Sequence, residues 1–248
     1  MPDAPSGYLS AVRRILEHIE TTQLPVVERA AALVTDRLTA GGAVWCGDIG
    51  HGNEGDFLNR AGGLACLHKF GFGLSVNDPI ADCRRNRPRP EPVDVEAETV
   101  RCALRASQMR LGDVLLLSSV SGKNTRPVEI AIACREMGIH VIGLTSLPYT
   151  GRVESLHTSG HKLCDAAEIV LDIGAPYGDA AVAIEGYPCD LLPVSGVAMI
   201  VLGWCLWGRV MELLAARGTP ASVFMSFNRD GGPEFYEQQS RRYQEQGF

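Results

Sequence analysis

The stretch that decides the fold is Asp113-Val-Leu-Leu-Leu-Ser-Ser-Val-Ser-Gly-Lys-Asn-Thr-Arg-Pro127. Its first part is a short apolar run, the pattern of a strand buried on both faces of a parallel sheet. A loop of hydroxyl and amide side chains follows, and a helix begins near Pro127, because proline is favoured just inside a helix start and Asn and Thr can cap it. The stretch therefore predicts a strand, a polar loop and a helix N-terminus, where free N–H groups favour an anion.

Strands and helices alternate along the rest of the chain. The apolar pattern predicts two N-terminal helices split near Thr22 to Pro25, buried strands at 43–46, 64–67, 139–144 and 168–172, and helices at 56–61, 93–109, 127–137, 161–166 and 195–216. Residues 71–92 form a long surface excursion, and 185–193 are irregular. The alternation indicates a parallel sheet with helices on both faces.

Four polar loops each follow a predicted strand. They are Gly47–Gly55, Ser118–Thr125, Thr145–Ser146 and Gly174–Asp179. Ligands of open parallel sheets bind beyond the carboxyl ends of the strands. We therefore expect the four loops to meet at one edge of the sheet.

Length and composition limit the class of protein. A chain of 248 residues with 46% hydrophobic and 21% charged residues can bury a full core, and we expect one domain over 1–248. Helices within 8–40 would pack on this domain, and the tail over 218–248, polar at its end, is expected to be partly disordered. The net charge of −6 argues against a nucleic-acid partner, whose phosphates require a basic face.

The apolar segments and cysteines predict a cytoplasmic protein. The first residues lack the apolar core of a signal peptide, and the longest apolar run, Val197 to Gly208, is too short to span a bilayer. That run predicts a buried helix. The eight cysteines are scattered without a CxxC pair, which fits a reducing compartment rather than a disulfide or zinc framework.

The ordered set of loops resembles the sugar isomerase (SIS) domain family. Ser119-Val-Ser-Gly-Lys-Asn is similar to the phosphosugar motif of that family. Gly50-His51, Arg60-Ala-Gly-Gly63 and Gly174-Ala-Pro-Tyr-Gly-Asp-Ala180 resemble a subgroup of small, mostly uncharacterised SIS-domain proteins, and the likeness extends to Asp230-Gly-Gly232. It implies a three-layer α-β-α sandwich with a five-stranded parallel sheet, flavodoxin-like, with extra N-terminal helices.

The resemblance also implies an activity. Family members isomerise aldose and ketose sugars, eliminate a sugar substituent, or only sense the ligand. We expect an aldose–ketose isomerase that acts through an enediol on a small sugar with a terminal phosphate or sulfonate. A sensing module and an amino-sugar-phosphate etherase are the alternatives. A homodimer or homotetramer with sites near the subunit interface is expected, without cofactor, metal, nucleic acid or membrane.

Roles for single residues follow from the same resemblance. Glu185 is the expected base, with Glu54 and Asp56 as runners-up. His51 and His157 are the expected catalytic histidines, and the resemblance implies that His157 can reach a neighbouring subunit's site. The expected substrate-binding residues are Gly50, Asn53, Ser119, Ser121, Lys123, Asn124, Thr125, Thr145, Ser146, Tyr177, Asp179 and Ser195. The hydroxyl residues could instead have the purely structural role of capping loops. Glu54 and Asp56 could instead only complement the dipole at a helix start.

Two positions depart from the family pattern. The first loop, from His51, lacks a second histidine of the subgroup, and Lys123 stands where better-known members often carry Glu. A lysine adds positive charge beside the anion site and could decide which anion is held. A metal site from His51, His157 and Asp179 has no supporting ligand spacing.

Overall fold

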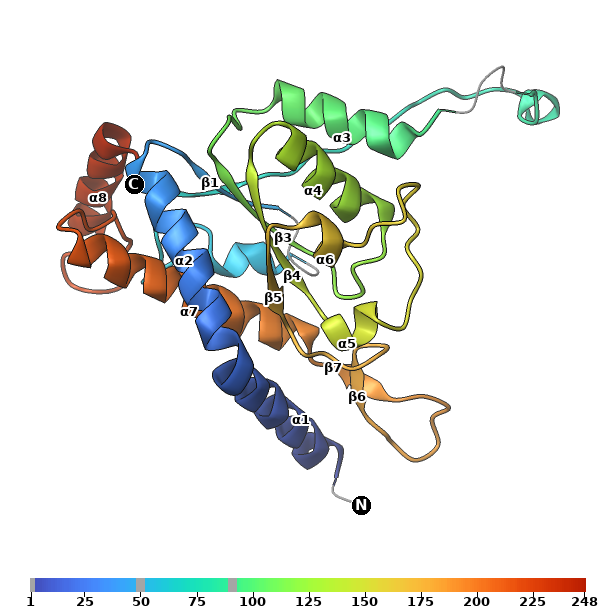
Figure 1. The fold of residues 1–248 in the computed structure, drawn as a ribbon, viewed down its shortest axis with the longest axis horizontal. Coiled ribbons are helices and arrows are strands. Elements are labelled where there is room, and N and C mark those ends of the chain that lie inside the picture. Colours follow the sequence, from blue (N-terminus) through green and yellow to red (C-terminus); the bar gives the residue numbers. More distant parts are fainter. Residues whose placement is uncertain (1–2, 48–51, 89–92) are drawn as a thin grey trace.

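A computed structural model of the chain describes residues 3–47, 52–88 and 93–248. Its main sheet has five parallel strands in the order β2-β1-β3-β4-β5 (Figure 1). The strands are β1 (Val44–Cys46), β2 (Leu67–Lys69), β3 (Val114–Ser118), β4 (His140–Thr145) and β5 (Ile169–Asp172). This order is flavodoxin-like, with the chain reversing direction across the sheet between β1 and β3. The predicted fold class is confirmed.

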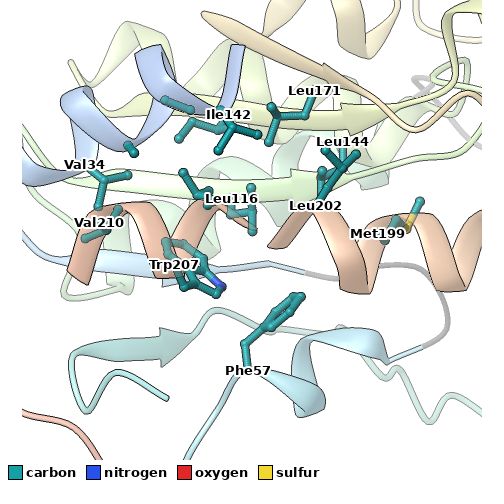
Figure 2. Close-up of a cluster of buried hydrophobic side chains, with 14 of the residues drawn as sticks. Val34, Phe57, Leu116, Ile142, Leu144, Leu171, Met199, Leu202, Trp207 and Val210 are labelled. Carbon is teal, nitrogen blue, oxygen red and sulfur yellow. The ribbon is translucent and has the colours of Figure 1, made fainter. Parts of the chain in front are cut away.

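Helices cover both faces of the sheet and form two cores. One face carries α1 (Ala4–His18), α2 (Leu24–Thr39) and α7 (Ser195–Ala216), and the other carries α3 (Val95–Ala106), α4 (Thr125–Glu136) and α6 (Leu163–Ala166). Figure 2 shows Trp207 and Leu202 of α7 against Leu116 of β3, with Phe57 beyond Trp207. Each such buried side chain contributes about 1.5–3 kcal/mol relative to exposure.

The long helix α7 is a core element. It matches the predicted bounds 195–216, and it is the one helix in the described ranges with the length and composition to cross a membrane. In this fold Ala198, Leu202 and Leu206 are fully buried in the core that α7 shares with α2 and the sheet. A helix buried in this way is apolar because it packs in a protein core.

The N-terminal helices do not separate as predicted. The five-residue π-helical segment η1 (Ile19–Gln23) joins α1 to α2 and keeps the chain helical. It buries Gln23, whose Oε1 accepts a hydrogen bond of 2.9 Å from the Asp172 N–H at the end of β5. The π-helical turn thus places Gln23 where it can bind the end of β5. Local helix propensity does not predict this contact.

Three other segments differ from the prediction. Residues 56–61 form no α-helix: a 3₁₀ turn, η2 (Asn53–Asp56), leads into further turns. The second strand lies at 67–69 rather than 64–67, since Leu64 bridges to Val223 outside the sheet. The tail is ordered as α8 (Gly232–Gln246), whose polar composition reflects its position on the surface.

The remaining elements are short. An antiparallel hairpin of β6 (Ala180–Val182) and β7 (Leu191–Pro193) encloses most of the segment 185–193 that was expected to be irregular. The surface excursion has one 3₁₀ turn, η3 (Asp82–Arg84), and α5 (Leu147–Thr150) follows β4. Figure 1 shows the hairpin extending at the lower right of the molecule and the excursion at the upper right.

Candidate anion-binding pocket

A pocket of about 460 Å³ lies at the carboxyl ends of β3, β4 and β5. This volume is in the range of small-molecule sites. Its apolar wall consists of Leu117, Val120, Pro127 and Ile130, and its polar wall of Ser118, Ser119, Ser121, Asn124, Arg126, Tyr149 and Asp179, with Gly178 beside them. Two of the four predicted polar loops, Ser118–Thr125 and Gly174–Asp179, thus line one pocket, and Tyr149 joins them from the segment after β4.

The serine loop after β3 is held tightly against the end of β4. The Ser119 N–H donates to the Leu144 carbonyl at 3.0 Å, and the Gly122 N–H donates to the Ser119 carbonyl at 3.1 Å. Gly122 has a φ of +66°, and a Cβ on it would lie 3.0 Å from Thr145 Oγ1. Glycine is therefore required here both for conformation and for space.

The start of α4 faces the same loop. Asn124 is the N-cap residue, but within the described chain its side chain makes no capping hydrogen bond. The Asn124 side chain therefore does not satisfy the first-turn N–H groups of α4, which lie next to the pocket that Asn124 lines. Together with the loop hydroxyls, these donors and the helix dipole favour a bound anion.

Thr145 and Ser146 support the loop from inside instead of lining the pocket. Both are fully buried. The Thr145 hydroxyl donates to the Val120 carbonyl at 3.3 Å, and the Ser146 hydroxyl donates to the Ala175 carbonyl at 2.5 Å. Their hydroxyls join the loops after β3, β4 and β5 to one another.

Asp179 fixes the start of α7. Its Oδ2 accepts from the Ser195 hydroxyl at 2.6 Å, and its Oδ1 accepts from the N–H groups of Ser195 at 2.9 Å and Val194 at 3.3 Å. Asp179 has a φ of +65°, a strained conformation for a residue other than glycine. Ser195 is buried at its side, so Asp179 reaches the pocket and Ser195 does not.

His157 is buried in a network outside the pocket lining. Its Nε2 lies 2.8 Å from Glu129 Oε2, and its Nδ1 lies 2.7 Å from the Ser159 hydroxyl. Glu129, on α4, also forms an ion pair with Arg101 of α3 at 2.8 Å. The network connects the segment 156–163 to α4. In the same segment, the Leu156 N–H donates to the Lys123 carbonyl at 2.9 Å. His157 is therefore held against α4 by contacts within its own chain.

The carboxylates proposed as bases occupy three different environments. Glu185 is exposed in the loop of the β6–β7 hairpin, outside the pocket lining. Glu54 is buried and pairs with Lys69 Nζ at 3.0 Å. Asp56 accepts from Trp204 Nε1 at 2.8 Å and pairs with Arg60 at 3.1 Å.

The other predicted residues lie around the pocket. The Asn53 amide lies at Gly196, in the first turn of α7. The Thr125 hydroxyl donates to the Leu156 carbonyl at 3.2 Å, and Lys123 is half-buried in the loop but absent from the lining. Tyr177 is exposed and packs edge-on against Tyr149, with ring centroids 5.0 Å apart. Gly50 and His51 lie outside the described residues.

Sequence reasoning missed three polar residues of the lining, Ser118, Arg126 and Tyr149. Arg126 is the second residue of α4. A cation there is opposed by the helix dipole, so an arginine at a helix start signals a nearby anion. Tyr149 gave no signal, because the short helix α5 that carries it was not predicted.

The buried thiols are unsuited to nucleophilic chemistry. Burial raises the pKa of Cys66 and of Cys134 to about 12, and burial together with the charge of Glu54 raises the pKa of Cys46. These groups are protonated at neutral pH. Over the residues the structure describes, no cluster of three or more His, Cys, Asp or Glu could hold a metal ion.

The fold and pocket define a doubly wound α/β protein with a small-molecule site at the ends of its strands. The family model of the SIS domain matches residues 7–146, and the chain belongs to this family. It is 32% identical over 247 residues to a UPF0309 protein of Streptomyces coelicolor, covering 98% of this chain and 97% of the relative. A UPF0309 protein of Halalkalibacterium halodurans is 32% identical over 229 residues, covering 91% and 92%.

Solved structures share the fold at low sequence identity. The phosphoheptose isomerase GmhA from Neisseria gonorrhoeae has a TM-score of 0.53 at 16% identity, covering 84% of this chain and 96% of its own. A phosphoheptose isomerase from Francisella tularensis has a TM-score of 0.51, also at 16% identity, covering 85% and 97%. At this identity the likeness concerns the fold.

Proposed function

We propose that this SIS-domain protein is a cytoplasmic aldose–ketose isomerase of a small sugar with a terminal anionic group. The observation that carries the proposal is the pocket in which Ser119, Ser121 and Asn124 meet the uncapped start of α4. An anion held there would leave the rest of the sugar toward Tyr149 and Asp179 across the pocket. Such remote binding positions the reacting carbons for proton transfer.

The base in this proposal is Glu185, acting in the pocket of a second copy of the chain. Glu185 is exposed on a hairpin that projects from the body (Figure 1), outside its own pocket lining. The described carboxylate in the lining, Asp179, already accepts three hydrogen bonds at the start of α7. An assembly that shares its sites would supply the base from a neighbouring hairpin.

The function is tested with a panel of hexose 6-phosphates and 6-sulfonates in deuterated water. Turnover is followed by NMR, and deuterium uptake at C2 reports the enediol. The absence of turnover on every sugar would contradict the isomerase proposal.

The base is tested by Glu185→Gln, which should lower kcat by about 10²- to 10⁴-fold because general-base catalysis contributes that much. Asp190→Asn, an exposed carboxylate in the same loop, is the matched control and should leave kcat unchanged. Mixing Glu185→Gln subunits with Ser119→Ala/Ser121→Ala subunits should restore part of the activity. If the mixed subunits recover no activity, the base acts within its own chain. If Glu185→Gln keeps full turnover, Glu185 is not the base.

A ligand-sensing module is the second candidate function. It is favoured by the same observation on Asp179, since a carboxylate that fixes a helix start is poorly placed to move protons. In this case the panel would show saturable binding in calorimetry without turnover or deuterium uptake. That result would replace the isomerase proposal.

A further inference from the structure

Arg126 is the feature of the pocket that the proposed function does not yet use. Among the described residues that line the pocket, it is the only one with a positive charge. It lies on the α4 wall with Pro127 and Ile130, directly after the serine loop. Lys123, the cation that the sequence favoured, is outside the lining.

Glu96 and Phe72, which are both outside the pocket lining, contact the Arg126 guanidinium. Glu96, in the first turn of α3, binds it in a bidentate ion pair, through Nε and through Nη2, the latter at 3.3 Å. The ring of Phe72, from the surface excursion, lies 5.4 Å from the guanidinium carbon, within cation–π range. The Arg126 side chain is still half-exposed, and the residue is part of the pocket lining.

The charges around this group favour a ligand with more than one negative charge. The guanidinium is nearer to the pocket than its counter-ion, because Arg126 is part of the lining and Glu96 is not. Beside the start of α4, the Arg126 charge and the positive end of the α4 dipole together give a positive field. The carboxylate of the lining, Asp179, is held instead at the start of α7 by three hydrogen bonds. The attraction of an anion to this field grows in proportion to its charge.

We infer that Arg126, held by Glu96 and Phe72, is the specificity-determining residue of this pocket and selects a dianionic phosphate over a monoanionic sulfonate. A guanidinium can bind two phosphate oxygens in parallel, which a lysine cannot do. Glu96 competes with the ligand for the N–H donors of Arg126 and so weakens the binding of a ligand with a single negative charge. This inference rests on the proposed function, because it names the anion that the same site binds.

The test measures the affinity of the full chain for methyl phosphate and methanesulfonate by calorimetry. A pH of about 8 keeps the phosphate dianionic, since its second pKa is about 6. The wild type should bind methyl phosphate more tightly than methanesulfonate. Arg126→Gln should weaken the binding of methyl phosphate by about tenfold to a hundredfold, the range for hydrogen bonds to charged groups, and remove most of the preference.

Three further variants separate this role from general effects. Arg135→Gln, at the opposite end of α4, removes the same charge and should keep the affinity for methyl phosphate within about twofold. Arg126→Lys, which keeps the charge but not the fork, should recover only part of the affinity. Glu96→Gln removes the competing carboxylate and should tighten methyl phosphate by about two- to fivefold. Circular dichroism of each variant checks that the fold is intact.

The outcomes distinguish this inference from the proposed function. If the wild type binds methyl phosphate and Arg126→Gln binds it equally well, the inference is wrong and the anion pocket stands. If Lys123→Gln loses more affinity than Arg126→Gln, Lys123 selects the anion. If the wild type binds neither probe, the proposed function fails together with the inference.

Discussion

Gly203 of α7 has no space for a side chain because the Phe57 ring occupies that position. A Cβ on Gly203 would lie 2.2 Å from the Phe57 ring. Phe57 is fully buried and packs edge-on against both Trp204 and Trp207 of the same helix, with ring centroids 5.6 and 6.3 Å away. The ring therefore cannot move aside without opening the core between the first loop and α7.

Replacing Gly203 by Ala should destabilise the protein by about 1–3 kcal/mol, the usual cost of overpacking a core. Gly208→Ala, one turn further along α7, is the matched control, since a Cβ there meets no atom within 4 Å. It should be neutral or stabilise by up to about 1 kcal/mol, because alanine is the better helix former. Urea unfolding of both variants measures the difference, and equal stabilities would contradict the packing argument.

At single positions, the residue type predicted which polar side chains gather at the site, but it did not predict which of them point into the pocket. The sequence identified Ser119, Ser121, Asn124 and Asp179, all of which line the pocket. It could not distinguish them from Thr145 and Ser146, whose hydroxyls donate to buried carbonyls. The direction of a side chain depends on loop conformation, which period and composition do not encode.

Among the elements, those with a strong apolar pattern were predictable. Strand β3 is buried at every position, and α7 is largely apolar, so both lie where the pattern placed them. The hairpin of β6 and β7 was missed because its strands have three residues each, too few to show a period. Its geometry also depends on Asp179 and Leu192, which have φ values of +65° and +64°.

Asp179 should be important for the start of α7. Asp179→Ala removes an acceptor for two backbone N–H groups and for the Ser195 hydroxyl. Loss of such a cap costs about 0.5–2 kcal/mol. Chemical denaturation should detect this loss, whereas Asp190→Ala, in the exposed hairpin loop, should stay within about 0.5 kcal/mol of the wild type. An undiminished stability of Asp179→Ala would show that α7 needs no cap.

For the molecule as a whole, the C-terminal helix completes the edge of the sheet. The Tyr243 hydroxyl of α8 lies 2.6 Å from His68 Nε2 on the edge strand β2. His68 also packs against Trp45 of β1, with ring centroids 5.2 Å apart. Its partial burial lowers the pKa of its imidazole below the usual value of 6.5, against the opposing charge of Asp113.

This environment makes the stability of the protein depend on pH. The folded pKa of His68 is the lower one, so between the two pKa values the unfolded chain binds more protons. The contribution of His68 to the free energy of unfolding should be complete above about pH 6.5 and decrease as the pH falls toward the folded pKa, by at most about 1.4 kcal/mol per unit. Urea unfolding between about pH 5 and 8 measures this slope.

His68→Gln provides the control, because its amide can still bond to Tyr243 but does not titrate. The slope attributed to His68 should disappear in this variant while the other titrating groups keep theirs. An identical pH profile for the two proteins would assign the dependence to other residues.

The pocket lies between two cores that share little besides the sheet. Its serine loop leads into α4, which belongs to one core, whereas Asp179 is hydrogen-bonded to the start of α7, which belongs to the other. A ligand that contacts both walls is thus a non-covalent cross-link between the two layers. At a hundred times its dissociation constant it would stabilise the folded chain by about 2.7 kcal/mol. The concentration of this ligand would then determine how strongly the unfolding of one layer is coupled to the unfolding of the other.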